Sequence, residues 1–212
     1  MISGFSTHTR VFTFGNQSIQ LVVPDAFSVQ QRYSTFNKQN EHLVFPFWSK
    51  VWPAAVGMCE WLAQHPHYIN NKSILELAAG LGLPSVFSSL YAKQVYCTDI
   101  VLEAVDFAQQ SALVNNFSNM FCSILDWNNA STSHCDILLL SDVNYDSAQF
   151  DKLYKVIHGF LNSGTTIIIS TPQRLMAKPF VEKLLLFCIE RDECIVEEEQ
   201  IQTAVSIFVL KR

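Results

Sequence analysis

A short apolar strand that passes through a glycine turn directly into a helix is the feature that most constrains this fold. It is the run ILELAAGLGLPS, residues 74–85. Gly80 and Gly82 lack a Cβ atom, so a ligand can approach the backbone closely, and the first N–H groups of the following helix have no partner within it. Asp99 ends the next apolar run, where its carboxylate is placed to accept hydrogen bonds from two ribose hydroxyls. Together these features indicate a site for an adenosine-containing ligand.

Strand-like and helix-like segments alternate along the rest of the chain. Repeated units of this kind favour a parallel sheet with helices on both faces. Two last strands without a helix between them predict an antiparallel pair at one edge, joined by an acidic loop at residues 197–199. The sequence therefore predicts a Rossmann-like α/β fold with a mostly parallel sheet of seven strands. The expected strands are 73–77, 94–98, 120–124, 137–140, 165–170, 193–197 and 203–210, and the expected helices are 54–64, 81–91, 102–116, 147–160 and 175–189.

The amino-terminal part has a different pattern. Residues 10–14 and 19–23 alternate apolar and polar side chains around a Gly-Asn turn, which predicts a β-hairpin. A polar stretch at 30–41 and an aromatic segment at 45–53 follow, and Pro53 suits the first turn of a helix. We expect residues 1–44 to form a hairpin and lead-in, and residues 45–212 to form the main domain.

Composition narrows the possible partners. The net charge is −5 and the chain has no long basic run, which argues against a nucleic-acid partner. The six cysteines show no C-x-x-C spacing, so they predict buried thiols in a reducing compartment and no metal site. A signal peptide and a membrane-length apolar stretch are both absent from the sequence. The default expectation is a cytoplasmic monomer without membrane contact.

Two other nucleotides compete for the glycine turn. Gly80-x-Gly82-x-x-Ser85 approximates a nicotinamide dinucleotide fingerprint, but a carboxylate at Glu76 would repel a pyrophosphate and would attract an amino group. A P-loop is excluded because no Gly-Lys-Ser/Thr follows.

Five segments occur in an order that resembles the seven-strand, class I S-adenosylmethionine-dependent methyltransferases. They are 48–53, 74–85, 96–100, 126–127 and 138–146. More narrowly, residues 45–212 resemble the family-16 branch of protein lysine methyltransferases, which shows a tryptophan before a Pro-Ala helix start, an E-L-G-x-G-x-G loop, a D-W pair and a D-x-x-Y motif. One departure is Ala78, which stands where that branch has its first glycine.

The resemblance implies S-adenosylmethionine as cofactor and assigns roles to individual residues. Its methionine end would be lined by Glu76, Gly80 and Gly82, and its ribose would be held by Asp99. Its adenine would lie between Asp126 and Trp127, with Trp52 closing the site and Ser141 at the tip of a strand that faces the donor.

The methyl acceptor is expected at the D-x-x-Y motif. Asp142 and Tyr145 follow an apolar strand, and ligands of open α/β sheets bind beyond the carboxyl ends of strands. We expect Asp142 to orient a lysine amine and Tyr145 to enclose it, while Asp146 and Ser147 cap the next helix. A protein lysine is the expected acceptor. A small-molecule or RNA acceptor, a non-catalytic binding module and a nicotinamide oxidoreductase remain as alternatives.

Overall fold

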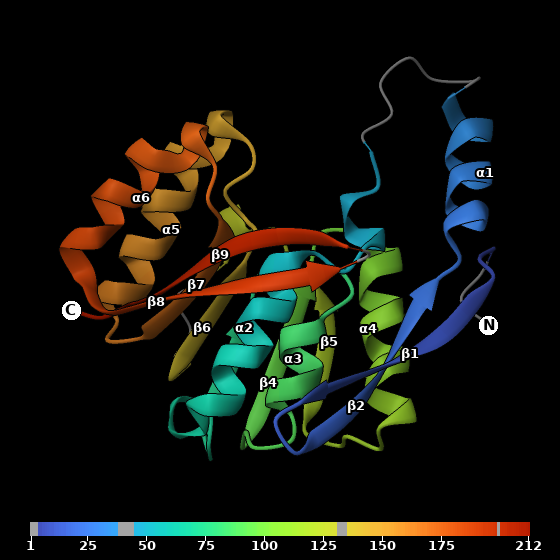
Figure 1. Ribbon diagram of the computed structural model, residues 1–212, viewed down its shortest axis with the longest axis horizontal. Helices are drawn as coiled ribbons and strands as arrows, with labels where there is room; N and C mark the ends of the chain where they lie inside the picture. Colours follow the sequence, from blue (N-terminus) through green and yellow to red (C-terminus); the bar gives the residue numbers. More distant parts are fainter. Residues whose placement is uncertain (1–3, 38–44, 131–134, 199) are drawn as a thin grey trace.

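A computed structural model of the chain describes residues 4–37, 45–130, 135–198 and 200–212. A seven-stranded sheet in the order β5-β4-β3-β6-β7-β9-β8 forms its centre (Figure 1). The first five strands in that order are parallel, and β9 runs antiparallel to both β7 and β8. The strands are β3 Ser73–Glu76, β4 Gln94–Asp99, β5 Met120–Ile124, β6 Ile137–Ser141, β7 Thr166–Pro172, β8 Cys188–Glu198 and β9 Ile201–Leu210. This arrangement confirms the predicted Rossmann-like class and the antiparallel final pair.

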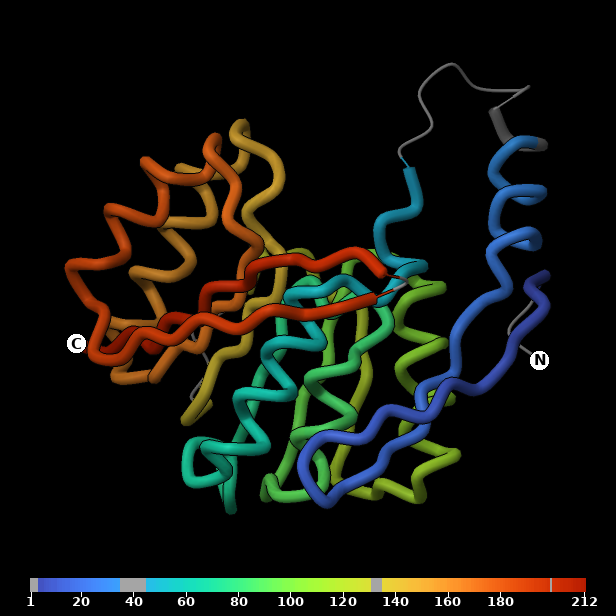
Figure 2. Tube along the Cα trace, in the orientation of Figure 1, coloured from blue at the N-terminus to red at the C-terminus, as the bar shows by residue number. Residues whose placement is uncertain are grey.

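Alternate residues of the central strands fill two separate cores. Leu139 and Ile168 face the first core together with α2 (Pro53–Gln64), α3 (Leu83–Ser88) and α4 (Leu102–Val114). Leu138 and Ile167 face the second core together with α5 (Phe150–Asn162) and α6 (Lys178–Leu184). Side chains in a strand point to opposite faces in turn, so a run of consecutive apolar residues can bury both faces. The two helical layers lie on either side of the sheet in Figures 1 and 2.

The amino-terminal hairpin forms a separate two-stranded sheet, as expected. Strands β1 (Thr7–Phe14) and β2 (Gln17–Pro24) pair across a turn in which Gly15 has a φ of 58°. The free edge of β2 is covered by side chains of α4. Ser111 Oγ accepts the Val22 N–H at 2.9 Å, and Asn115 Oδ1 accepts the Gln20 N–H at 2.9 Å. The helix thus replaces a third strand for part of this edge.

Three predicted segments differ from the structure. A helix, α1 (Ala26–Asn37), occupies the start of the polar stretch, and Asp25 accepts the Ser28 N–H at its amino end. The predicted helix at 175–189 is broken into η5 (Leu175–Ala177), α6 and η6 (Leu185–Phe187), and β8 already begins at Cys188. The predicted acidic loop is wrong for Glu197 and Glu198, which belong to β8, while Glu199 lies outside the described residues.

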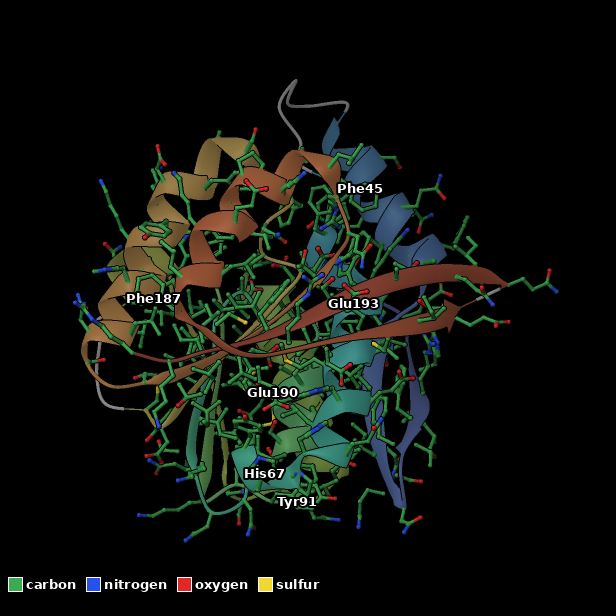
Figure 3. All side chains as sticks on the ribbon, turned by 60° about the vertical axis from the view of Figure 1, so that its left-hand side comes forward. Phe45, His67, Tyr91, Phe187, Glu190 and Glu193 are labelled. Atoms are coloured by element: carbon green, nitrogen blue, oxygen red, sulfur yellow. The ribbon has the colours of Figure 1, made fainter. Side chains whose placement is uncertain are left out.

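The long strand β8 is tied to the carboxyl end of α2. Tyr68 of η2 (Pro66–Tyr68) donates its hydroxyl to Glu190 Oε2 at 2.5 Å, and His65 Nε2 lies 3.7 Å from Glu190 Oε1. Figure 3 shows Glu190 of β8 on the same side of the molecule as His67 of η2. Among the described residues, no helix combines the length and apolar character that crossing a membrane requires.

Candidate functional site

A cavity of about 410 Å³ opens at the carboxyl ends of β3, β4 and β6. The strand order reverses between β3 and β6, which is the position where open α/β sheets bind their ligands. Five segments line the cavity: the glycine loop (78–83), the end of β4 (99–101), the turn after β5 (125–128), the end of β6 with the loop beyond it (141–149) and the aromatic lead-in (45–55). Most of the predicted site residues therefore meet around one cavity.

The carboxylate of Asp99 anchors the glycine loop. Its Oδ2 accepts the Gly80 N–H at 2.8 Å and its Oδ1 accepts the Val101 N–H at 2.9 Å. Burial raises the pKa of Asp99, and the backbone N–H donors partly oppose that shift. The side chain still lines the cavity, so each oxygen keeps lone pairs for a hydroxyl of a ligand.

Left-handed backbone shapes the loop. Ala78, Gly80 and Gly82 have φ values of 53°, 55° and 75°, a region in which glycine is much less strained than alanine. A Cβ on Gly82 would lie 2.9 Å from Cys97 Sγ, so this glycine is required by packing beneath the loop as well. The sequence argument attributed both glycines to ligand approach and did not foresee this contact.

Glu76 lies behind the loop and does not line the cavity, which corrects the expected position of this side chain. It is fully buried, and its Oε2 accepts both the backbone N–H and the hydroxyl of Ser85, at 2.9 and 2.5 Å. Its Oε1 has no hydrogen-bond partner among the described residues. Burial raises the pKa of Glu76 to about 8, against the lowering effect of the Ser85 donors. The carboxyl group thus braces the start of α3.

Asp126 and Trp127 lie in the turn that follows β5, and both line the cavity. Asp126 Oδ1 accepts the N–H and the side-chain amide of Asn128, which makes it the cap of η3 (Trp127–Asn129). Trp127 packs partly against the second core. The cap geometry holds the Asp126 carboxylate at the rim of the cavity.

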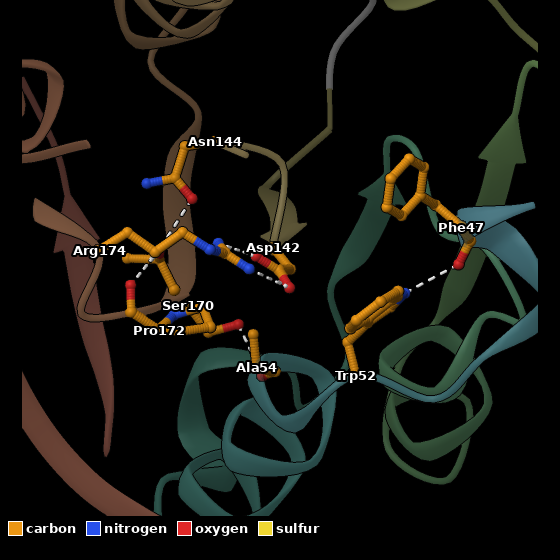
Figure 4. Close-up of polar contacts among 9 residues, drawn as sticks. Phe47, Trp52, Ala54, Asp142, Asn144, Ser170, Pro172 and Arg174 are labelled. Atoms are coloured by element: carbon orange, nitrogen blue, oxygen red, sulfur yellow. Dashed lines mark hydrogen bonds and ion pairs between the residues drawn. The ribbon is translucent and has the colours of Figure 1, made fainter. Parts of the chain in front are cut away.

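Aromatic rings form the wall on the amino-terminal side. Trp52 Nε1 donates to the Phe47 carbonyl at 2.8 Å (Figure 4), and the Phe47 ring lies 5.1 Å from the ring of Tyr145. Phe47 belongs to η1 (Phe47–Ser49), and Tyr145 belongs to the loop after β6. Burial raises the pKa of Tyr145, and the nearby carboxylate of Asp99 adds to the shift. The phenol is therefore neutral at physiological pH.

Asp142 makes a contact that the sequence did not predict. Both of its oxygens accept hydrogen bonds from the guanidinium of Arg174, with 3.0 Å between Nη2 and Oδ2 (Figure 4). Asp142 and its neighbour Ser141 line the cavity at the end of β6. Asp146 accepts the Ala148 N–H at 2.9 Å and caps η4 (Ser147–Gln149), which confirms the predicted cap for Asp146. Ser147 is the first residue of η4 and is not its cap, so that part of the prediction was wrong.

Sequence reasoning missed several residues of the site. Trp48 and Lys50 line the cavity beside the predicted Trp52, and Gln149 lines it beyond the D-x-x-Y motif. The aromatic segment was noted, but only Trp52 was singled out. Arg174 stands 32 positions from Asp142 in the chain, so no local pattern pointed to their contact.

The lysine methyltransferase family matches residues 39–186, which is more than half of the chain. The chain belongs to this family. The match confirms the resemblance inferred from the glycine loop and the D-x-x-Y motif, and it includes every predicted site residue.

Two similar proteins are named for methylation of different residues. The zebrafish (Danio rerio) electron transfer flavoprotein beta subunit lysine methyltransferase is 26% identical over 150 residues, which cover 70% of this chain and 58% of the relative. The human (Homo sapiens) histone-arginine methyltransferase METTL23 is 27% identical over 143 residues, which cover 64% of this chain and 75% of the relative. The family member described here thus spans little more than half of the first of these proteins.

Solved structures share the fold. One is the N-methyltransferase NodS from Bradyrhizobium japonicum, in complex with S-adenosyl-L-homocysteine. It has a TM-score of 0.61 at 15% identity, and the match covers 85% of this chain and 98% of the NodS chain. The tRNA (uracil-54, C5)-methyltransferase from Pyrococcus abyssi has a TM-score of 0.57 at 11% identity and covers 95% of this chain and 44% of its own. One of these proteins is named for methylation of nitrogen and the other for methylation of a uracil carbon, so the likeness concerns the fold alone.

Proposed function

We propose that this protein transfers a methyl group from S-adenosylmethionine to a lysine side chain of another protein. The observation that carries the proposal is that one cavity joins the Asp99-anchored glycine loop to Asp142 and Tyr145 of the D-x-x-Y motif. A donor held on the first side would present its reacting group to an acceptor on the second. The relatives named for lysine and arginine methylation support a protein acceptor.

The lining of the cavity fits the cofactor. Asp99 would accept from ribose hydroxyls, and Asp126 would accept from the adenine amine beside the Trp127 ring. Gly80 and Gly82 would leave the loop backbone open toward the methionine part, with Ser141 across from them, whereas Glu76 would act from behind the loop through Ser85. When bound, S-adenosylmethionine supplies an electrophilic methyl group on a sulfonium centre.

The acceptor side must place an amine lone pair and exclude water. Asp142 would orient the amine, since a carboxylate oxygen has lone pairs left after it accepts from Arg174. The rings of Tyr145, Phe47 and Trp52 would enclose the amine and its aliphatic stem. Alignment of the two reacting atoms supplies a large share of such rate enhancements.

The test combines binding and transfer. Calorimetric titration with S-adenosylhomocysteine and with NAD identifies the cofactor, and tritiated S-adenosylmethionine is then offered with the electron transfer flavoprotein beta subunit, core histones, total RNA and a small-molecule pool. We expect S-adenosylhomocysteine to bind and lysine residues to be labelled. Labelling of RNA or of small molecules alone overturns the acceptor class. Binding without transfer to any acceptor supports a non-catalytic module, and binding of NAD alone supports an oxidoreductase.

A pair of variants checks the assigned acceptor residue. Asp142→Asn should lower kcat by about a hundredfold while S-adenosylhomocysteine affinity changes little, because it removes an orienting charge from the acceptor side only. Asp151→Asn, on the exposed start of α5, is the matched control and should retain full activity. Undiminished transfer by Asp142→Asn overturns the assignment. The cytoplasmic location and the monomeric state remain predictions from the sequence.

A further inference from the structure

The connection after β7 brings a guanidinium against Asp142, on the acceptor side of the cavity. Arg174 lies two residues beyond the end of β7, and its Nη1 and Nη2 donate to the two oxygens of Asp142. The Asp142 side chain is 8% exposed and that of Arg174 is 29% exposed, so the pair is well shielded from water on the carboxylate side. Such two-point contacts fix the orientation of a carboxylate as well as its charge environment.

The backbone holds both partners in place. Asp142 has a φ of 54° and donates its N–H to the Ser170 carbonyl at 3.0 Å. Arg174 donates its N–H to the Pro172 carbonyl at 2.9 Å, and Thr171 donates its hydroxyl to Asn144 Oδ1 at 2.7 Å. The loop after β6 is thus joined to the end of β7 by two hydrogen bonds beside the ion pair, one of which, from Thr171 to Asn144, is drawn in Figure 4.

This arrangement bears on the proton that a lysine must lose. An ammonium has no lone pair to attack with, and an uncompensated carboxylate beside it would stabilise the charged form and raise its pKa. A guanidinium that remains protonated throughout the working pH range offsets that effect. On the basis of the proposed lysine methylation, we propose that Arg174 is a positioning residue that holds Asp142 and offsets its charge, so that the bound lysine amine deprotonates more readily.

The other charged groups around the cavity make this offset important. Among the described residues of the cavity wall, carboxylates outnumber cations. The ionisable side chains there are Asp99, Asp126, Asp142, Asp146, Lys50 and Tyr145. Tyr145 has a raised pKa and adds no positive charge. An acidic wall attracts a lysine ammonium but also retains its proton. Arg174 lowers that retention while leaving the other carboxylates free to attract a basic substrate.

The experiment measures kcat against pH for wild type, Arg174→Gln and Arg174→Lys. The acceptor is the electron transfer flavoprotein beta subunit, or the lysine-bearing protein that the transfer assay identifies. Arg191→Gln is the control, because Arg191 is exposed on β8 and pairs with Glu193. Thermal unfolding and S-adenosylhomocysteine affinity show whether each variant is folded.

We expect the acid limb of the kcat profile of Arg174→Gln to move to higher pH by about one unit, because removal of the positive charge raises the pKa of the bound lysine amine. A charge within about 4–6 Å of an ionisable group shifts its pKa by about 1–3 units. At neutral pH its kcat should fall about tenfold, and the loss should shrink as the pH rises. Arg174→Lys should restore most of the acid limb, and Arg191→Gln should match wild type.

Two results overturn the inference. An unshifted limb in a folded Arg174→Gln, with or without a uniform loss of kcat at every pH, would show that the charge of Arg174 does not govern the amine. A wild-type protein that methylates no lysine overturns the proposed function and this inference together. The first result leaves the proposed function intact, so the two failures are distinguishable.

Discussion

Asp99 and Gly80, from neighbouring parallel strand ends, are joined by a hydrogen bond of 2.8 Å from the Gly80 N–H to Asp99 Oδ2. The other carboxylate oxygen of Asp99, Oδ1, accepts the Val101 N–H in the turn after β4. One side chain therefore fixes the shape of the glycine loop and also lines the cavity. Loop shape and ligand contact are coupled through this carboxylate.

This coupling predicts a large effect of Asp99→Asn on cofactor binding. The variant keeps the size of the side chain but replaces one acceptor oxygen with a donor, which opposes the N–H of Gly80 or of Val101. We expect S-adenosylhomocysteine affinity to fall at least about tenfold, since hydrogen bonds to charged groups contribute about 1.5–3 kcal/mol. Calorimetry measures the loss, with Asp151→Asn as the control. Unchanged affinity would remove Asp99 from the binding site.

The strained alanine of the loop makes a second prediction. Ala78 has a φ of 53°, and an L side chain in this region costs about 1–2 kcal/mol relative to glycine. Ala78→Gly should therefore raise the midpoint of thermal unfolding by about 2–8 °C. The matched control is Ala112→Gly, in the buried face of α4, which should lower the midpoint. A lower midpoint for Ala78→Gly would contradict the left-handed conformation.

Glu76 predicts a specific dependence of stability on pH. Its pKa is raised from 4.5 to about 8 by burial, so the folded state favours the protonated carboxyl group more than the unfolded state does. The stabilisation is complete below the unfolded pKa and is lost as the pH rises from about 4.5 to about 8. The Glu76→Gln side chain cannot ionise, so this variant should not lose that part of its free energy of unfolding as the pH rises.

Urea unfolding at several pH values tests this assignment. The difference in the free energy of unfolding, Glu76→Gln minus wild type, should increase between about pH 4.5 and pH 8 and then become constant. Glu182→Gln, on the exposed face of α6, should give no such trend. A flat difference for Glu76→Gln would mean that Glu76 is ionised throughout this range in both states.

The attachment of the hairpin supplies a fourth prediction. Ser111 Oγ accepts the buried Val22 N–H and donates to the Phe107 carbonyl at 3.0 Å. Ser111→Ala leaves that N–H without its partner, which should destabilise the protein by about 1–3 kcal/mol. Hydrogen exchange at Val22 should accelerate as well. Ser123→Ala, at an exposed position of β5, should change neither quantity. Unaltered exchange at Val22 would show that another group holds the hairpin.

The parts of the fold that the sequence predicted well have strong local signals. Leu138 and Ile167 belong to uninterrupted apolar runs, and such runs between helical segments predict buried parallel strands. Helix α1 was missed because its apolar residues form no continuous stripe, and Phe27 is 71% exposed. The break near Cys188 was missed because apolar residues continue from α6 into β8 without a marker between them.

The candidate site likewise has parts that local patterns predicted and parts that they did not. The glycine loop, Asp99 and the D-x-x-Y motif are compact patterns, and the predicted residues of these patterns meet at one cavity apart from Glu76. The position of Glu76 depends on Ser85, whose hydroxyl donates a hydrogen bond to the carboxyl group at the start of α3. The partner of Asp142 depends on how two loops fold together. Contacts of this kind arise from tertiary packing, so the residue types alone did not predict them.

The position of β9 between β7 and β8 has a consequence for the order of assembly. Strand β8 precedes β9 in the chain, yet its neighbour in the sheet is β9 alone. During synthesis on the ribosome, β8 therefore has no partner strand until residues 201–210 have emerged. The nascent chain carries an unpaired strand of 11 residues in the meantime. Its exposed Ile189 and Ile195 make this interval the one in which the strand is open to aggregation.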